Sequence, residues 1–165
     1  MSQIIKKTRC LKFTTGLLLA LALVVSSLTI PAQASAASTS ANRKAVLKLV
    51  NQERKKRDRG KLTLDSKLNK AAGKRAKEIS KEFSHTRPNG DDCFTVLTTY
   101  HAKYSTCGEN IAAGQSTAKK VMNNWMQSPG HKQNILQKKF RKMGVGYYKK
   151  KGSSYTYYWV QIFTD

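Results

Sequence analysis

Residues 155–163 constrain the fold most, because both the odd-numbered and the even-numbered positions of this segment are largely apolar. Successive side chains of a strand point to opposite faces of a sheet. Two sets would face opposite ways: Trp159, Gln161 and Phe163, and Tyr158, Val160 and Ile162. Since both sets are largely apolar, a strand here must be covered on both faces. The chain therefore needs a sheet that lies between two other layers.

A second strand over residues 144–148 forms a hairpin with this segment. The turn residues Gly152, Ser153 and Ser154 lie between the two strands, which favours antiparallel pairing. Helical patterns occupy the chain before the hairpin, so helices supply the covering layers. The expected fold class is α+β, an α-β-α sandwich with a small antiparallel sheet between helices.

Four helices are expected, over residues 43–57, 65–83, 116–127 and from Pro129 onward. Ser116 or Thr117 would cap the third helix, and Ser128 followed by Pro129 is a strong helix start. The second helix has a clear apolar face, formed by Leu68, Ala72, Ala76, Ile79 and Phe83. The basic run 54–57 is interpreted as a solvated helix end. A short helix followed by a loop is expected within 93–104, and Trp125 and Trp159 are expected in the core.

The N-terminus predicts export. A basic segment precedes an apolar run over residues 16–30, and small residues follow it. We predict a signal peptide over 1–36, cleaved after Ala34 or Ala36, then a flexible leader over 37–42 and one domain over 43–165. An uncleaved membrane anchor is the alternative. Cys10 lies before the apolar run, which excludes a lipoprotein anchor there.

The chain is strongly basic, with a net charge of +22. Removing the signal peptide leaves +18, from 27 basic and nine acidic residues. This net positive charge attracts polyanions, and outside a cell these are anionic cell-wall polymers or lipid headgroups. A role in solubility alone is the alternative. Lysines and aromatic residues interleave from Tyr147 to Trp159, as in nucleic-acid binders, but export argues against dedicated nucleic-acid binding.

Two cysteines, Cys93 and Cys107, remain after cleavage. An even number in an exported chain predicts one disulfide. In the chain-entropy model, that loop closure would stabilise the fold by about 3 kcal/mol. A catalytic thiol beside a histidine is the alternative.

Four motifs stand out along the chain: Phe83-Ser84-His85, Gly108-Glu109-Asn110-Ile111-Ala112, the run from Trp125 to His131, and the run from Tyr158 to Phe163. Together they resemble the CAP superfamily, which groups the cysteine-rich secretory, antigen 5 and pathogenesis-related proteins. Their order and spacing are specific, and the similarity extends from about Arg43 to the C-terminus. The chain resembles the bacterial SCP-like form of the family. The resemblance implies an α-β-α sandwich, in agreement with the patterns above.

The resemblance also implies a cleft with two histidines and two acidic residues, which in some members holds a divalent metal. Matched by motif, these are His85, Glu109 and His131, and Ser128 stands near the place of the second acid. We expect Ser128, Asn110 and Gln161 to line the cleft, although structural roles are favoured for Asn110 and Gln161. His101 matches no motif and is expected on the surface.

Two imidazoles and one carboxylate could bind zinc or another divalent cation and leave a position open for water. Zinc would lower the pKa of that water and permit hydrolysis. A structural role, in which the groups hydrogen-bond within the protein, is the alternative. The catalytic candidates are therefore the same three residues, His85, Glu109 and His131.

The favoured function is a secreted, monomeric protein that acts by binding outside the cell and adheres to the anionic envelope. The family includes sterol and lipid binders, so the resemblance allows a small apolar ligand. A metal-dependent extracellular hydrolase of peptide or cell-wall substrates is the first alternative. A polyanion-binding envelope protein with a vestigial cleft is the second. Tyrosines near Lys149-Lys150-Lys151 would offer an aromatic surface to a glycan or polymer.

Overall fold

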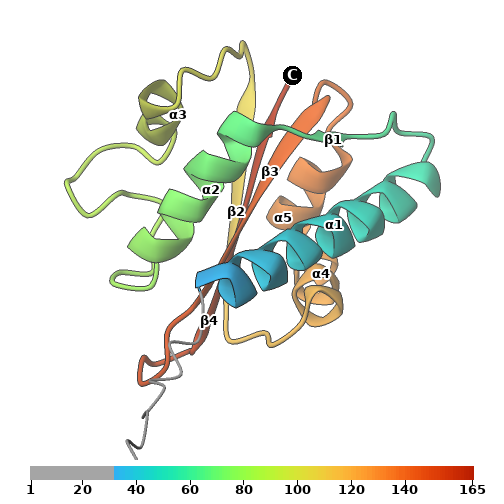
Figure 1. Ribbon diagram of the computed structural model, residues 1–165. Coiled ribbons are helices and arrows are strands. Elements are labelled where there is room, and N and C mark those ends of the chain that lie inside the picture. Colours follow the sequence, from blue (N-terminus) through green and yellow to red (C-terminus); the bar gives the residue numbers. More distant parts are fainter. Residues whose placement is uncertain (1–31) are drawn as a thin grey trace, which may run out of the picture. The chain divides into compact units, whose positions relative to one another are not determined.

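The computed structural model describes residues 32–165 (Figure 1). Residues 1–31, which hold most of the predicted signal peptide and the whole apolar run, lie outside the described residues. Within the described part, no helix is long and apolar enough to cross a membrane.

A four-stranded sheet with the order β1-β3-β4-β2 forms the middle layer. The strands are β1 (Thr63–Leu64), β2 (Cys107–Ala113), β3 (Lys142–Lys149) and β4 (Tyr157–Thr164). β3 and β4 form the predicted antiparallel hairpin, and β2 pairs antiparallel with the other side of β4. The sheet is mixed rather than wholly antiparallel, because the short β1 runs parallel to β3.

Helices cover both faces of this sheet, which confirms the α-β-α sandwich (Figure 1). One layer contains α1 (Ala32–Lys55), α4 (Ala118–Gln127) and α5 (Pro129–Leu136), and the other contains α2 (Ser66–Glu78) and α3 (Thr95–Thr99). Two hydrophobic clusters follow from this arrangement, one on each face of the sheet. Trp125 and Trp159 are both buried in the cluster under α1 and α4, as expected.

The helix starts follow local sequence signals. Asp65 caps α2, and its carboxylate accepts hydrogen bonds from the backbone of Lys67 and Leu68. Thr117 caps α4 through its hydroxyl, and Pro129 occupies the first turn of α5. These positions match the predicted starts. A side-chain acceptor pairs with a free backbone N–H in the first turn of a helix, and a proline there has no N–H that needs a partner.

Three helix predictions need correction. Residues 37–42, expected as a flexible leader, are helical, because α1 begins at Ala32 in an alanine-rich stretch without glycine or proline. α2 ends at Glu78, and Phe83 beyond it is 49% exposed rather than packed in the core. The run 54–57 is not wholly solvated, since Arg54 is fully buried.

The buried Arg54 ties the end of α1 to the segment that follows α5. Its guanidinium donates hydrogen bonds to the carbonyls of Gly60, Ile135, Gln137 and Phe140, at 2.6 to 3.4 Å. A planar group with five donors can satisfy several carbonyls at once. Arg54 therefore fixes the C-terminal end of α5, whose first turn carries His131.

α2 lies directly on β3 at two glycines. A Cβ atom built at Gly144 would lie 2.1 Å from the backbone of Leu68, and one at Gly146 would lie 2.0 Å from the Ala72 carbonyl oxygen. Only glycine allows such a close approach of two backbones. This contact fixes the distance between α2 and the sheet, and with it the position of the buried polar residues of α2.

Candidate functional site

Glu109 lies in β2, at the edge of the sheet, and its side chain points toward the α2 layer. It pairs in register with Ile162, a member of the cluster beneath α2. Only 2% of the Glu109 side chain is exposed. β2 was not predicted as a strand. The strand places the carboxylate inside the protein, where it needs a partner.

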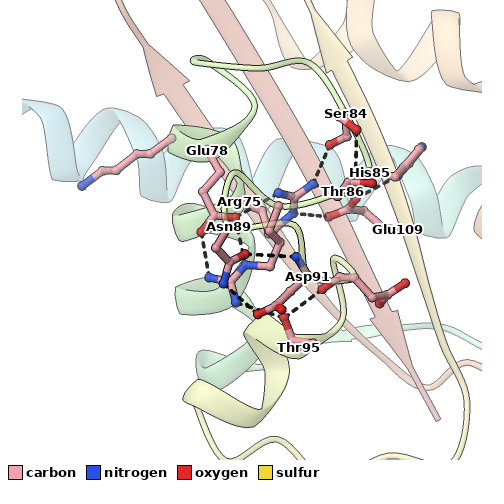
Figure 2. A network of polar contacts seen from close by, with 12 residues as sticks. Arg75, Glu78, Ser84, His85, Thr86, Asn89, Asp91, Thr95 and Glu109 are labelled. Carbon is pink, nitrogen blue, oxygen red and sulfur yellow. Dashed lines mark hydrogen bonds and ion pairs between the residues drawn. The ribbon is translucent and has the colours of Figure 1, made fainter.

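Arg75 of α2 is that partner. Its Nε donates to Oε2 of Glu109 at 2.9 Å, and its Nη2 donates to Oε1 at 3.3 Å. The same guanidinium donates to Glu78 at 2.9 Å and to the carbonyl of Ser84 at 2.7 Å (Figure 2). Arg75 is fully buried, so this forked ion pair forms away from solvent.

A second arginine extends the network toward the surface. Arg87 donates two hydrogen bonds to the Glu78 carboxylate, at 2.8 and 3.2 Å, and a third to Thr95 at 3.0 Å (Figure 2). The loop that follows α2 and the start of α3 are thereby tied to α2. This loop carries His85.

His85 is the exposed end of the network. Its Nδ1 lies 2.8 Å from Oε1 of Glu109, while 56% of the side chain is exposed (Figure 2). The imidazole can donate its Nδ1–H to the carboxylate and leave its second nitrogen as an acceptor or a metal ligand. Two of the three residues expected in the cleft, His85 and Glu109, are therefore in contact.

The surroundings keep Glu109 ionised. Burial alone would raise the pKa of this carboxyl group. Hydrogen bonds from His85 and Arg75 and their positive charges outweigh burial, so the pKa of Glu109 lies below its ordinary value. A carboxylate held in this state can accept hydrogen bonds or bind a cation, but it holds no proton to give at neutral pH.

His131 lies in the opposite helical layer. It lies half-buried in the first turn of α5, on the other side of the edge strand β2. Burial lowers the pKa of His131, and the nearby charge of His85 lowers it further. The two histidines and Glu109 belong to segments at the edge of the sheet where the two helical layers meet.

The donor atoms that lie closest together belong to a different set from the predicted one. Among residues 32–165, the set comprises His85, Cys93 and Glu109, whose ligand atoms all lie within 4.8 Å of one another, and it does not include His131. Cys93 was predicted as half of a disulfide with Cys107. Both cysteines are free thiols, so the disulfide prediction is wrong for this structure.

The Cys93 thiol lies near the Glu109 carboxylate and the His85 imidazole. Burial and the charge of Glu109 raise the pKa of Cys93 to about 12. Burial likewise raises the pKa of Cys107 to about 11. Neither thiol is activated as a nucleophile, which argues against the catalytic-thiol alternative.

Asn110 and Gln161 do not line an open cleft, because both are completely buried. Asn110 donates to Gln161 at 3.0 Å and to the carbonyl of His131 at 3.1 Å, and it accepts from Asn134 at 2.9 Å. These bonds lie on the α5 side of the sheet and hold the first turn of α5 against β2. The structural role favoured from the sequence is therefore the observed one. Ser128 is half-buried at the N-cap of α5 and makes no capping bond with its side chain.

Arg75 and Cys93 are the site residues that sequence reasoning missed. A signal for Arg75 was available, because it lies within the apolar stripe that includes Ala72, Ala76 and Ile79. A charged residue in such a stripe needs a buried partner. Nothing local marked Cys93, since its position beside Glu109 depends on the path of the loop after α2.

An imidazole, a thiol and a carboxylate are suitable ligands for zinc. Two features of the site oppose a cation: the Cys93 thiol must lose its proton, and Arg75 already binds both oxygens of Glu109. Metal binding would therefore release a proton and depend on pH. The donor types fit a zinc ion, and His85 is the ligand open to solvent.

Comparisons with known proteins agree with the fold. The model of the CAP (cysteine-rich secretory protein) family matches residues 47–163. An uncharacterized Bacillus subtilis protein, YkwD, is 38% identical over 112 residues, which cover 67% of this chain and 44% of YkwD. An extracellular SCP-domain protein of Bacillus anthracis has 27% identity and a TM-score of 0.69, over 76% of this chain and 40% of that one.

A third protein, an outer surface protein of Borrelia burgdorferi, shares the fold. It has 23% identity and a TM-score of 0.67, over 74% of this chain and 90% of that one. This chain spans less than half the length of YkwD and of the Bacillus anthracis protein. The family match covers most of the sequence and includes every element that builds the site. The chain therefore belongs to the CAP, or cysteine-rich secretory protein, family.

Proposed function

We propose that this protein is exported and acts by binding, with a divalent cation at His85, Cys93 and Glu109 and a basic surface that retains it at the anionic envelope. The observation that carries the binding role is the convergence of His85, Cys93 and Glu109, whose ligand atoms all lie within 4.8 Å of one another. Because the buried Arg75 keeps Glu109 ionised and in place, Glu109 serves as a fixed acceptor and not as a proton donor.

Export is supported by the basic and apolar N-terminal sequence and by the description of the Bacillus anthracis relative as extracellular. Envelope retention is supported by the net charge of +18 that remains after removal of the predicted signal peptide. Exposed charges attract polyanions over distances of about 8–10 Å at physiological ionic strength. Salt should therefore weaken the attachment.

Cell fractionation tests this proposal. The protein should be recovered with intact cells at low salt and released by 0.5 M NaCl. Recovery entirely in the medium at low salt would contradict envelope retention. Retention at high salt would instead indicate a covalent or hydrophobic anchor.

A metal-dependent hydrolase is the second candidate, favoured by the convergence of His85, Cys93 and Glu109. It requires activity against a peptide or cell-wall substrate that a chelator removes and zinc restores. A His85→Asn variant should then lose that activity, whereas the exposed His101→Asn should retain it. His101 is a matched control because its backbone is left-handed, a conformation that asparagine accepts.

A further inference from the structure

A groove lined by cations and tyrosines lies between α1, α2 and the end of β3, apart from the Glu109 site. Its volume is about 470 Å³. The cationic and aromatic residues that line it are Arg43, Lys70, Lys74, Lys77, Tyr100, Tyr147 and Tyr148. Among residues 32–165, none with a carboxylate side chain belongs to its lining.

The lysines form one stripe along the exposed side of α2. Lys70, Lys74 and Lys77 follow the spacing that places side chains on one helix face, and Lys81 continues it just past the helix end. A rise of 1.5 Å per residue spreads the first three over roughly 10 Å. The opposite side of the same helix carries Arg75 and packs on the sheet.

A second hollow continues the groove. It has a volume of about 370 Å³ and shares Lys74, Lys77 and Tyr148 with the first, to which it adds Lys81 and Lys150. Glu78 also borders it, but its carboxylate is bound by Arg75 and Arg87. The two hollows together form an elongated basic track rather than a compact pocket.

The positive charge of this track is not neutralised within the protein. The ion pairs formed by residues 32–165 include none of its lysines. Arg43 is held in place, because its Nε donates to the Val145 carbonyl at 2.9 Å and its Nη2 donates to the Asn69 carbonyl at 3.3 Å. A fixed guanidinium at the base of a lysine stripe is suited to bind phosphate groups.

The tyrosines add apolar surface to this charge. Tyr147 is half-buried, and its ring packs at 4.5 Å from Trp159, so its position is fixed. Tyr148 is half-buried and borders both hollows. Aromatic rings offer flat surfaces for the C–H groups of sugars and polyols, and their hydroxyls offer hydrogen bonds.

We propose that this groove binds a linear phosphodiester polymer with polyol or sugar units, of the kind that makes up anionic cell walls. An elongated channel suits a polymer better than a flat lipid surface. The combination of evenly spaced lysines and fixed tyrosines matches alternating phosphate and polyol units. The inference rests on the proposed export and gives the proposed envelope binding a specific site.

The test is a titration of the purified protein with poly(glycerol phosphate) at 50, 100 and 200 mM NaCl. The variant Lys70→Gln/Lys74→Gln/Lys77→Gln removes three charges from the groove. Its matched control, Lys119→Gln/Lys120→Gln/Lys139→Gln, removes three exposed charges outside the groove lining. Both variants have the same net charge, so a difference between them reports the site.

We expect the groove variant to bind at least 10-fold more weakly at 100 mM NaCl, and the control to change less than 3-fold. By the single-strand relation of about 0.7 per phosphate contact, the salt slope of the groove variant should fall by roughly 2. Equal weakening of both variants would overturn the proposal. So would tighter binding of the unaltered protein to single-stranded DNA or to phosphatidylglycerol vesicles than to the polymer.

Cell fractionation of the unaltered protein tests the proposed envelope retention separately from the groove. Recovery in the medium together with a groove-specific loss of polymer binding would refute envelope retention and leave the groove intact. Retention at the envelope together with equal polymer binding by both variants would refute the groove and leave retention intact.

Discussion

Replacing Gly146 with alanine should separate α2 from the sheet. A Cβ atom there would lie 2.0 Å from the carbonyl oxygen of Ala72 and 2.4 Å from its carbonyl carbon. Both atoms belong to the helix backbone, so no side-chain rotation relieves the clash. α2 must move away from β3 by about 1 Å or more to restore ordinary contact.

Overpacking of a well-packed core typically costs about 1–3 kcal/mol. We expect the upper end of this range, about 3 kcal/mol of unfolding free energy, because the obstacle is backbone. For a domain of this size that corresponds to a fall in Tm of roughly 10 °C. Arg75 would move with α2, so its hydrogen bonds with Glu109 should lengthen as well.

The measurement is chemical denaturation of Gly146→Ala against Gly130→Ala. Gly130 lies in the first turn of α5, where an added Cβ atom would meet no other atom within 4 Å, and it has no left-handed φ. Alanine there should leave the stability unchanged or raise it by about 0.4–1 kcal/mol. A Gly146→Ala protein whose unfolding free energy equals that of the unaltered one would refute the close contact of α2 with β3.

Three further outcomes follow from the site. Arg75→Met leaves Glu78 without one partner and Glu109 buried beside His85 alone, and it should cost about 3–5 kcal/mol in chemical denaturation; an unchanged unfolding free energy would contradict the role given to Arg75. Burial would raise the pKa of both acids, but their arginine partners, with His85 at Glu109, lower each below its ordinary value. Glu78 and Glu109 therefore contribute fully to the free energy of unfolding above about pH 4.3, and this contribution is lost as the pH falls through their pKa values in the folded protein. Tm should fall as the solution is acidified below that pH, and Glu78→Gln should flatten that fall; an equal acid dependence of both proteins would contradict this. Alkylation of the unreduced, denatured protein should label Cys93 and Cys107, as mass spectrometry would show. A protein that is labelled only after reduction would instead support the predicted disulfide.

The hairpin and its covering helices were predictable because their signals are local. Residues 155–163 are apolar on both faces. The N-cap Thr117 precedes α4 directly, and Pro129 is the first residue of α5. The strand β2 was missed because glycine, glutamate and asparagine are uncommon in strands. It forms because its whole length pairs with β4, far along the chain.

The site was predictable only in part. The resemblance to the CAP family indicated His85 and Glu109, and the structure brings these two side chains into contact. The partner of Glu109 is Arg75, 34 residues earlier, and helical arginines are usually solvated. Cys93 was assigned to a disulfide on the basis of cysteine number and export, which carry no information about where a thiol points.

The structure divides the chemistry of this CAP protein between two surfaces. A buried ion pair holds Glu109 beside an exposed histidine at the edge of the sheet. A groove of lysines and tyrosines lies along the outer side of α2. α2 connects them, since Arg75 and the lysine stripe occupy opposite faces of the same helix.

Zinc titration of the purified protein tests the proposed cation site most directly. We expect one zinc ion per chain, at least 10-fold weaker binding in His85→Asn, and no change in His101→Asn. Because the metal must displace a proton from Cys93, affinity should rise about 10-fold per pH unit between pH 7 and 8.5. Equal zinc affinity in all three proteins, or an affinity independent of pH over that range, would contradict the assignment of His85, Cys93 and Glu109 as the cation site.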